Sequence, residues 1–112
     1  MFGTTTIAGR LTAAPTLRET PQGKAVTTLR VAVDDHRLGD ESPRFVDVDQ
    51  WEEGAQHAVA HLVQGQQVTA EGLLHVDAYI KDGTPQVGWN LRRARVEWGP
   101  RPRGAQRDPA ER

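Results

Sequence analysis

A single stretch of helical periodicity, placed between segments that alternate like β-strands, limits the fold of this chain more than any other feature. In that stretch, apolar side chains recur at the spacing of one helix face, at Ala55, Ala58, Val59, Leu62 and Val63. Gly65 follows, at a place where the end of a helix favours glycine. A chain of 112 residues has the length of one domain. We therefore expect one mostly β domain that contains a single helix.

Strand-like segments account for most of the remaining chain. Alternation or β-prone composition predicts five strands, at Thr4–Leu11, Ala25–Val33, Arg44–Trp51, Gln66–Ile80 and Val87–Trp98. The Asp-Gly pair in KDGTPQ predicts a tight turn between the last two. This order predicts an all-β OB-fold, a five-stranded Greek-key barrel with one helix between strands 3 and 4. The helix would close the end of the barrel and bury Ala58, Val59 and Leu62.

The composition narrows the class of protein. The chain has no cysteine, which excludes disulfides and thiolate metal ligands and fits a reducing, cytoplasmic location. No apolar run is long enough to cross a membrane. Proline, glycine and arginine prevail from Gly99 onward, so we expect a domain over residues 1–98 and a disordered tail over 99–112. The net charge is −1, without the basic surplus that nucleic-acid modules usually carry.

No group of residues predicts catalysis. His57 and His61 have a spacing that can chelate a metal, but they fall opposite the apolar stripe and lack the His-Glu pattern of zinc enzymes. Asp34 and Asp35 are neighbours at a strand end and point to opposite faces. The sequence has no phosphate-binding glycine loop and no nucleophile elbow. We therefore expect a protein that is not an enzyme and uses no metal or cofactor.

Several segments together resemble the bacterial single-stranded DNA-binding protein family. They are GRLTAAPTLRETPQGKAVTTLRVAV, FVDVDQW, the helix end HLVQG and VTAEGLL, in the family's order and spacing over about residues 3–98. The resemblance implies an OB-fold subunit that assembles as a homo-oligomer, usually a homotetramer and otherwise a dimer. It also implies binding of single-stranded DNA in replication, recombination or repair, without sequence preference and without catalysis.

The resemblance and the physics of single-strand binding select the same kinds of side chain. Aromatic rings are platforms for unstacked bases, and cations follow the phosphate backbone. The ring candidates are Phe45, Trp51, Tyr79 and Trp89; Trp51 is equally a candidate anchor for the strand–helix junction, and Trp98 is expected in the core. The cation candidates are Arg10, Arg18, Arg30 and Arg37, which match the family, with Lys24 and Lys81 beside turns and Arg92 from a cluster with Arg93 and Arg95.

Acidic side chains stand where the family usually has other residues. Glu19 replaces a tyrosine, Glu53 a lysine, Asp49 an apolar residue and Asp77 a basic one. Fewer phosphate contacts weaken binding, so we expect a weak interaction that moderate salt abolishes. The alternative is an OB-fold protein-interaction module, similar to primosomal proteins, with weak or lost DNA binding.

The predicted tail departs from the family as well. Family members of the main replicative type end in an acidic peptide with an apolar tip, which recruits repair and replication enzymes. Residues 99–112 are basic on balance and have no such tip. We therefore expect no recruitment of that kind, and an accessory or tail-less member of the family.

Overall fold

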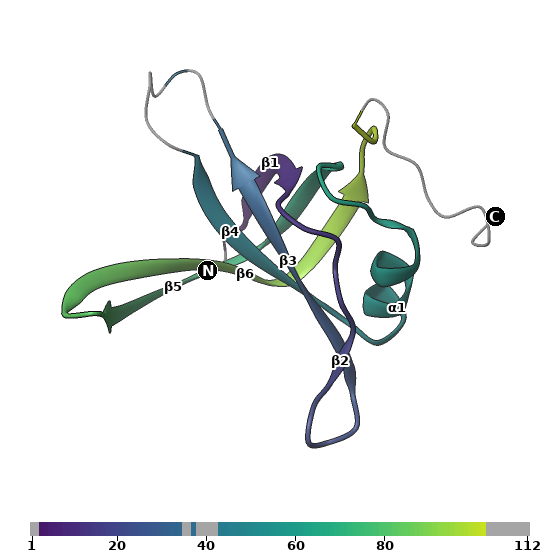
Figure 1. Cartoon of the computed structure of the whole chain (residues 1–112), viewed down its shortest axis with the longest axis horizontal. Coiled ribbons are helices and arrows are strands. Elements are labelled where there is room, and N and C mark those ends of the chain that lie inside the picture. Colours follow the sequence, from purple (N-terminus) through teal and green to yellow (C-terminus); the bar gives the residue numbers. More distant parts are fainter. Residues whose placement is uncertain (1–2, 35–36, 38–42, 103–112) are drawn as a thin grey trace.

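The strands of this chain close into a barrel, and the helix covers one end of it (Figure 1). The structure is a computed structural model that describes residues 3–34, 37 and 43–102. Its elements are β1 (Thr5–Leu11), β2 (Arg18–Glu19), β3 (Ala25–Val33), β4 (Arg44–Trp51), α1 (Glu52–His61), β5 (Gln67–Lys81) and β6 (Thr84–Trp98). The five expected strands and the helix are confirmed in their order. The two-residue strand β2, which pairs with the start of β3, was not expected.

The barrel closes because β1 pairs on both of its sides. The strands follow the order β1-β5-β6-β4-β3-β2, and β1 also pairs with β3. Arg10 lies opposite Ala32 in that second pairing, and Leu11 lies opposite Val31. Strand β4 runs parallel to β6, and all the other pairs are antiparallel. The ring β1-β5-β6-β4-β3 is the partly open barrel of the OB-fold, as expected.

The core lies inside this ring and under the helix. Strands β3, β4, β5 and β6 point every second side chain inward, as period-two alternation requires. The buried apolar cluster is Leu11, Leu29, Val31, Val46, Val48, Ala58, Leu62, Val68, Ala70 and Leu91. Ala58 and Leu62 are thus buried as expected, whereas Val59 is only half-buried.

The end of the helix and the position of Trp98 differ from expectation. The helix ends at His61, and Leu62 already has an extended backbone. Gly65 therefore does not cap the helix; its N–H donates to the carbonyl of Leu11 in the following turn. Trp98 is 41% exposed and packs beside the imidazoles of His57 and His61, each 5.8 Å away between ring centroids. The prediction that Trp98 lies in the core was wrong, because helix α1 covers only part of its ring.

Strands β5 and β6 continue past the barrel as a two-stranded ribbon, on the side away from α1 (Figure 1). The register shifts between Glu71 and Leu73, where β6 contains Arg93 with a φ of 52°. The ribbon ends in the expected tight turn at Asp82 and Gly83, whose φ values of 52° and 78° suit this kind of hairpin.

The first residues of the predicted tail contact the barrel. Gly99 donates its N–H to the carbonyl of Gln67, and Gln67 donates to the carbonyl of Pro100. Arg101 donates from Nη2 to the carbonyl of His61 at 3.1 Å. Residues 103–112 lie outside the described residues, so the disordered tail and the boundary at residue 98 stay predictions.

Closure of the barrel predicts a severe effect of one small substitution. A Cβ at Gly9 would overlap the carbonyl oxygen of Ala32 and lie 2.8 Å from Val31 Cγ1, so β1 and β3 could not keep their spacing. We expect Gly9→Ala to lower the free energy of unfolding in urea by about 1–3 kcal/mol. Gly3→Ala is the control, since a Cβ there has no atom within 4 Å. Equal stability of the two variants would contradict this account of closure.

Candidate functional site

Three of the four predicted rings and one predicted arginine line a single concavity. It has a volume of about 290 Å³ and lies between β3, β4 and the β5–β6 ribbon. The predicted residues in its wall are Arg30, Phe45, Tyr79 and Trp89, joined by Pro43, Arg44, Asp47, Gln86, Val87 and Gly88. All four predicted side chains are exposed, so the concavity is open to a ligand from solvent.

Strand register explains why these side chains meet. Arg30 lies opposite Asp47, Asp47 is paired with Asn90, and Asn90 lies opposite His75. Directly paired residues point to the same face of a sheet, so this row forms one outer surface across β3, β4, β6 and β5. Tyr79 belongs to the same face of the ribbon, because it keeps the alternation that starts at His75.

Arginine and aromatic side chains contact one another in the concavity. The guanidinium carbon of Arg30 lies 4.8 Å from the centroid of the Phe45 ring, in cation–π geometry. Tyr79 lies across Gly88, where a Cβ would be 3.5 Å from Tyr79 Cε1. The ring therefore lies within ordinary contact distance of the position that a Cβ at Gly88 would take.

Trp89 lies at the border between two surfaces. Its register opposite Val46 and Val76 places it on the inner face of the sheet, where Val46 is buried. Its ring is nevertheless 39% exposed and also borders the outer concavity. Trp89 is therefore less clearly part of the outer surface than Phe45 and Tyr79.

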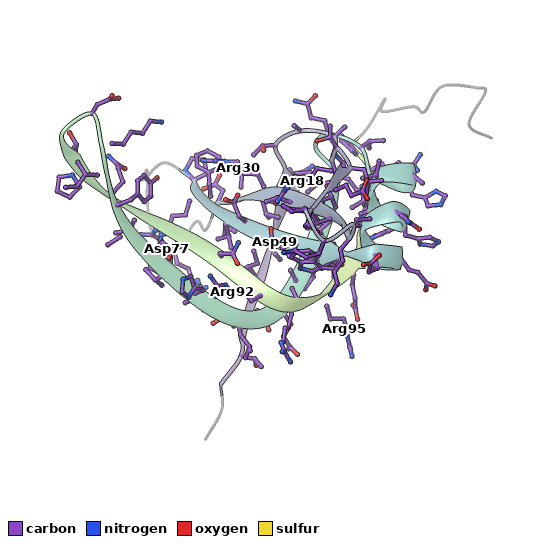
Figure 2. The ribbon with its side chains drawn as sticks, turned by 90° about the horizontal axis from the view of Figure 1, so that it is seen from below. Arg18, Arg30, Asp49, Asp77, Arg92 and Arg95 are labelled. Carbon is purple, nitrogen blue, oxygen red and sulfur yellow. The ribbon has the colours of Figure 1, made fainter. Side chains whose placement is uncertain are left out.

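Carboxylates interrupt the same outer surface. Figure 2 shows Arg18, Arg30 and Asp49 over the β2–β4 side, and Asp77 and Arg92 along the β5–β6 ribbon. Arg18 Nη2 donates to Thr28 Oγ1 at 3.0 Å, and Thr28 Oγ1 donates to Asp49 Oδ1 at 2.8 Å. Asp77 Oδ1 lies 2.7 Å from His75 Nε2. The surface therefore combines cations and rings with fixed acidic groups.

Asp47 is the acidic group most affected by its surroundings. Partial burial raises the pKa of its carboxyl, the Arg30 guanidinium opposes this by lowering it, and the Asp49 carboxylate raises it further. Desolvation is the largest of these causes, so the net direction is upward. The concavity thus contains an acid that takes up a proton more readily than an exposed aspartate.

The other predicted residues lie outside the concavity. Trp51 is 49% exposed at the end of β4, directly before α1. Alternation along β4 points its side chain to the same outer face as Phe45. Arg92 is exposed and lies opposite Leu73, just after the register shift, where the β5–β6 ribbon begins. Four more of the predicted cations are exposed, namely Arg18 on β2, Lys24 before β3, Arg37 between β3 and β4, and Lys81 at the end of β5.

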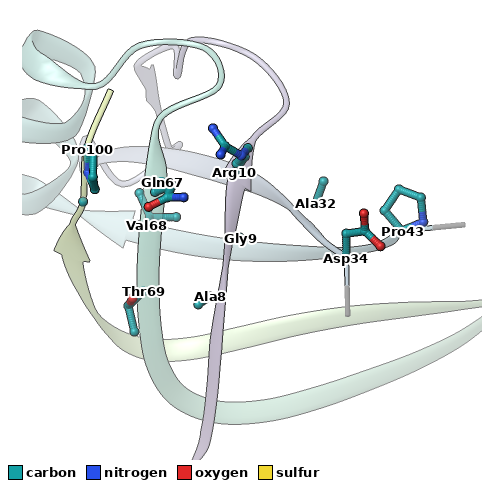
Figure 3. Close-up of a pocket in the computed structure, with 11 residues that line it drawn as sticks. Ala8, Gly9, Arg10, Ala32, Asp34, Pro43, Gln67, Val68, Thr69 and Pro100 are labelled. Carbon is teal, nitrogen blue, oxygen red and sulfur yellow. The ribbon is translucent and has the colours of Figure 1, made fainter. Parts of the chain in front are cut away.

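Arg10 lines a neighbouring hollow rather than the concavity. It lines a hollow of about 740 Å³ across β1 and β5, together with Gln67, Thr69 and Asp34 (Figure 3). Arg10 Nη1 lies 3.4 Å from the carbonyl oxygen of Gly65. Arg10 does not line the concavity of Arg30, Phe45 and Tyr79, but its pairing with Ala32, which pairs with Phe45, places it on the same outer face one strand further on.

Sequence reasoning missed Arg44, Gln86 and Gly88 as parts of the site. The hairpin contained a usable signal, because a two-residue Asp-Gly turn pairs Lys81 with Thr84 and therefore Tyr79 with Gln86. The last strand was expected to start at Val87, but β6 starts at Thr84. This late start left Gln86 in the turn rather than beside the tyrosine.

Two further observations concern metal ligands and membrane-spanning helices among the described residues. His57 and His61 are exposed, with ring centroids 5.1 Å apart, and no third metal-binding side chain joins them within the part of the chain that the structure describes. None of the described helices is long and apolar enough to span a membrane.

Comparison with known proteins gives one consistent family. The model of the single-strand binding protein family matches residues 2–94. A single-stranded DNA-binding protein of Thermus aquaticus is 38% identical over 94 residues, and one of Thermus thermophilus is 40% identical over 93. The single-stranded DNA-binding protein 2 of Streptococcus agalactiae serotype III is 33% identical over 86 residues.

The matches cover most of this chain and a smaller part of each relative. They include 81% of the chain for both Thermus proteins and 74% for the Streptococcus protein. They include 33% of each Thermus protein and 66% of the Streptococcus protein. The chain thus spans about a third of the length of the Thermus relatives.

The raised pKa of Asp47 predicts a stability that depends on pH. Its folded-state pKa lies above the unfolded value, so ionised Asp47 destabilises the fold, and this cost disappears as pH falls through the folded pKa. We expect Asp47→Asn to be more stable than the unmodified chain at neutral pH, with the difference shrinking toward acidic pH. Urea unfolding at several pH values measures it, with Asp34→Asn as an exposed control. A constant difference across pH would show that Asp47 is not the cause.

Proposed function

The chain belongs to the single-strand binding protein family, and from this premise we propose that it binds single-stranded DNA without sequence preference. The observation that supports this most is the outer concavity in which Arg30, Phe45 and Tyr79 lie together. Exposed rings beside a guanidinium are the two kinds of group that hold an unpaired strand. The activity is binding alone, without catalysis.

The proposed contacts follow from the chemistry of the wall. The exposed rings of Phe45 and Tyr79 would stack on bases, which contributes about 1–3 kcal/mol per base and does not depend on base identity. Arg30 already lies over Phe45, so its guanidinium would contact a phosphate next to the stacked base. Arg18 and Arg92 are exposed on the two sides of the surface (Figure 2), and Lys81 is exposed at the end of β5. All three would extend the contact with the DNA backbone.

The carboxylates modify this proposal rather than replace it. Asp47, Asp49 and Asp77 reduce the positive potential of the surface and repel phosphates, so we propose a low affinity. A protein-interaction module is less well supported, because the family and the three relatives described above are all named for binding single strands.

The wider setting is also a proposal. We propose a role in DNA replication, recombination or repair, in the cytoplasm, with the chain assembled as a homo-oligomer. The small core and the edge of β1 that faces away from β5, unpaired from Thr5 to Gly9 among the described residues, support self-association. A tetramer or a dimer would satisfy this proposal equally.

Electrostatic binding predicts a strong response to salt. We expect oligothymidylate to quench tryptophan fluorescence at low ionic strength and to lose nearly all binding at moderate ionic strength. Each phosphate contact contributes about 0.7 to the slope of log K against log salt for a single strand. A titration at several salt concentrations measures that slope. No change in fluorescence at low salt would refute the proposed function.

The concavity itself can be tested by substitution. We expect Tyr79→Ala to weaken binding about 5- to 150-fold, the loss of one stacked base. Arg30→Ala should weaken binding and also lower the salt slope by about 0.7, the loss of one phosphate contact. Arg95→Ala is the matched control, because Arg95 lies apart from the concavity and 3.7 Å from Glu97 (Figure 2). If the control weakens binding as much as Arg30→Ala, the concavity is not the site.

A further inference from the structure

Two histidines and a tryptophan form a cluster of rings at the end of the barrel that α1 covers. His57 and His61 lie one helical turn apart on α1, and both side chains are exposed. Trp98, at the end of β6, packs beside both imidazoles, with its ring centroid 5.8 Å from each. Helix α1 lies on the side of the molecule away from the β5–β6 ribbon (Figure 1). The cluster is therefore separate from the concavity proposed to bind DNA.

The distance between the two imidazoles fits a shared metal ion. Their ring centroids are 5.1 Å apart, and the ring planes are inclined by 71°. A histidine nitrogen binds zinc at about 2.1 Å, which puts the ring centroid about 3.2 Å from the metal. Two such rings at a tetrahedral angle have centroids about 5.2 Å apart, whereas the right angle of a square-planar ion requires about 4.5 Å. The observed separation thus suits a tetrahedral ion better than a square-planar one.

The packing of Trp98 gives the histidine pair a property that two isolated surface residues lack. The indole is inclined by 38° to the His57 ring and by 43° to the His61 ring, so it packs against both. Its position beside the two rings keeps them together on one side of α1. Side chains that are already gathered lose less conformational freedom when a ligand binds. Rotation about the last torsion of each histidine, which is broad, then turns a ring nitrogen toward a common ion.

The end of the helix favours a cation at this place. His61 is the last residue of α1, where the carbonyl groups carry the partial negative charge of the helix dipole. Glu53 lies one turn before His57 on the same face and adds a carboxylate. Glu97 lines a groove together with His57 and adds another. Arg101 opposes them, because its Nη2 donates to the carbonyl of His61 at 3.1 Å.

We propose that His57 and His61 chelate a divalent transition-metal ion, with zinc as the preferred ion. The two imidazoles supply two ligands, and water molecules complete the coordination, because no third metal-binding side chain joins them among the described residues. Imidazole nitrogen suits zinc, copper and nickel, whereas calcium and magnesium take oxygen ligands. This site goes beyond the proposed binding of single-stranded DNA and does not depend on it.

Urea unfolding of the full chain with and without zinc tests the site. Zinc that binds the folded chain more tightly than the unfolded chain raises the urea midpoint, so we expect a rise for the unmodified protein. His57→Ala and His61→Ala should each lower the zinc affinity about 100-fold or more, because a chelate becomes a single contact. His75→Ala is the matched control, since its Nε2 lies 2.7 Å from Asp77 Oδ1 on β5. Magnesium should leave the midpoint unchanged in every variant.

The tryptophan beside the histidines reports where the ion binds. We expect cobalt(II), an open-shell ion with the same ligand preferences, to quench the fluorescence of Trp98, one of three tryptophans in the chain, and excess zinc to restore it. Trp98→Phe should lose this quenching and keep the rise in the urea midpoint with zinc. Circular dichroism verifies that each variant is folded, which is expected because both histidines are exposed.

Three results would each overturn the proposal. One is a urea midpoint of the unmodified chain that zinc leaves unchanged. Another is a zinc affinity of His57→Ala equal to that of the unmodified chain. The third is an equal loss of affinity in His75→Ala, which would show that the ion binds elsewhere. Oligothymidylate titration is a separate measurement, so a failure of DNA binding leaves these outcomes unaffected.

Discussion

The pairing of β1 with β3 determines most of what the rest of the molecule can do. Only two residue pairs, Arg10 with Ala32 and Leu11 with Val31, join these strands, and Gly9 lies against the Ala32 carbonyl where a side chain has no room. This pairing converts an open sheet into a ring with a single interior. Period-two alternation then assigns every strand residue to the core or to the outside. The candidate site is a consequence of that assignment.

The β5–β6 ribbon extends the same assignment beyond the barrel, where no core exists to cover it. Residues in phase with Leu91 remain apolar, and residues in phase with Tyr79 are mostly polar. One face therefore adds Tyr79 to the concavity that contains Arg30 and Phe45, while the other leaves an apolar surface with no partner in a single chain. The two faces are not fully separate, since Val87 and Trp89 of the apolar face also line the concavity.

Much of the fold and part of the site could be predicted from the sequence, for identifiable reasons. The strands and the helix were predictable because their periods differ, and the Asp-Gly turn because it needs positive φ at two positions. Phe45 and Tyr79 were correctly expected to be exposed. Trp98 was misplaced, since periodicity gives the direction of a side chain but not whether another element covers it. Arg10 and Arg30 line different hollows of one outer face, and which hollow each side chain lines could not be read from the sequence, because it depends on the pairing of distant strands.

The sequence alone determined the order of the elements, the inward and outward phase of each strand and the kinds of side chain available, because these follow from local periodicity and composition. Only the tertiary structure decided which outward residues meet. Inter-strand register placed Arg30 beside Asp47, and ring closure placed Arg10 opposite Ala32, in the row that continues to Phe45. Register depends on hydrogen bonds between segments far apart in the chain, and no local pattern of residues contains that information.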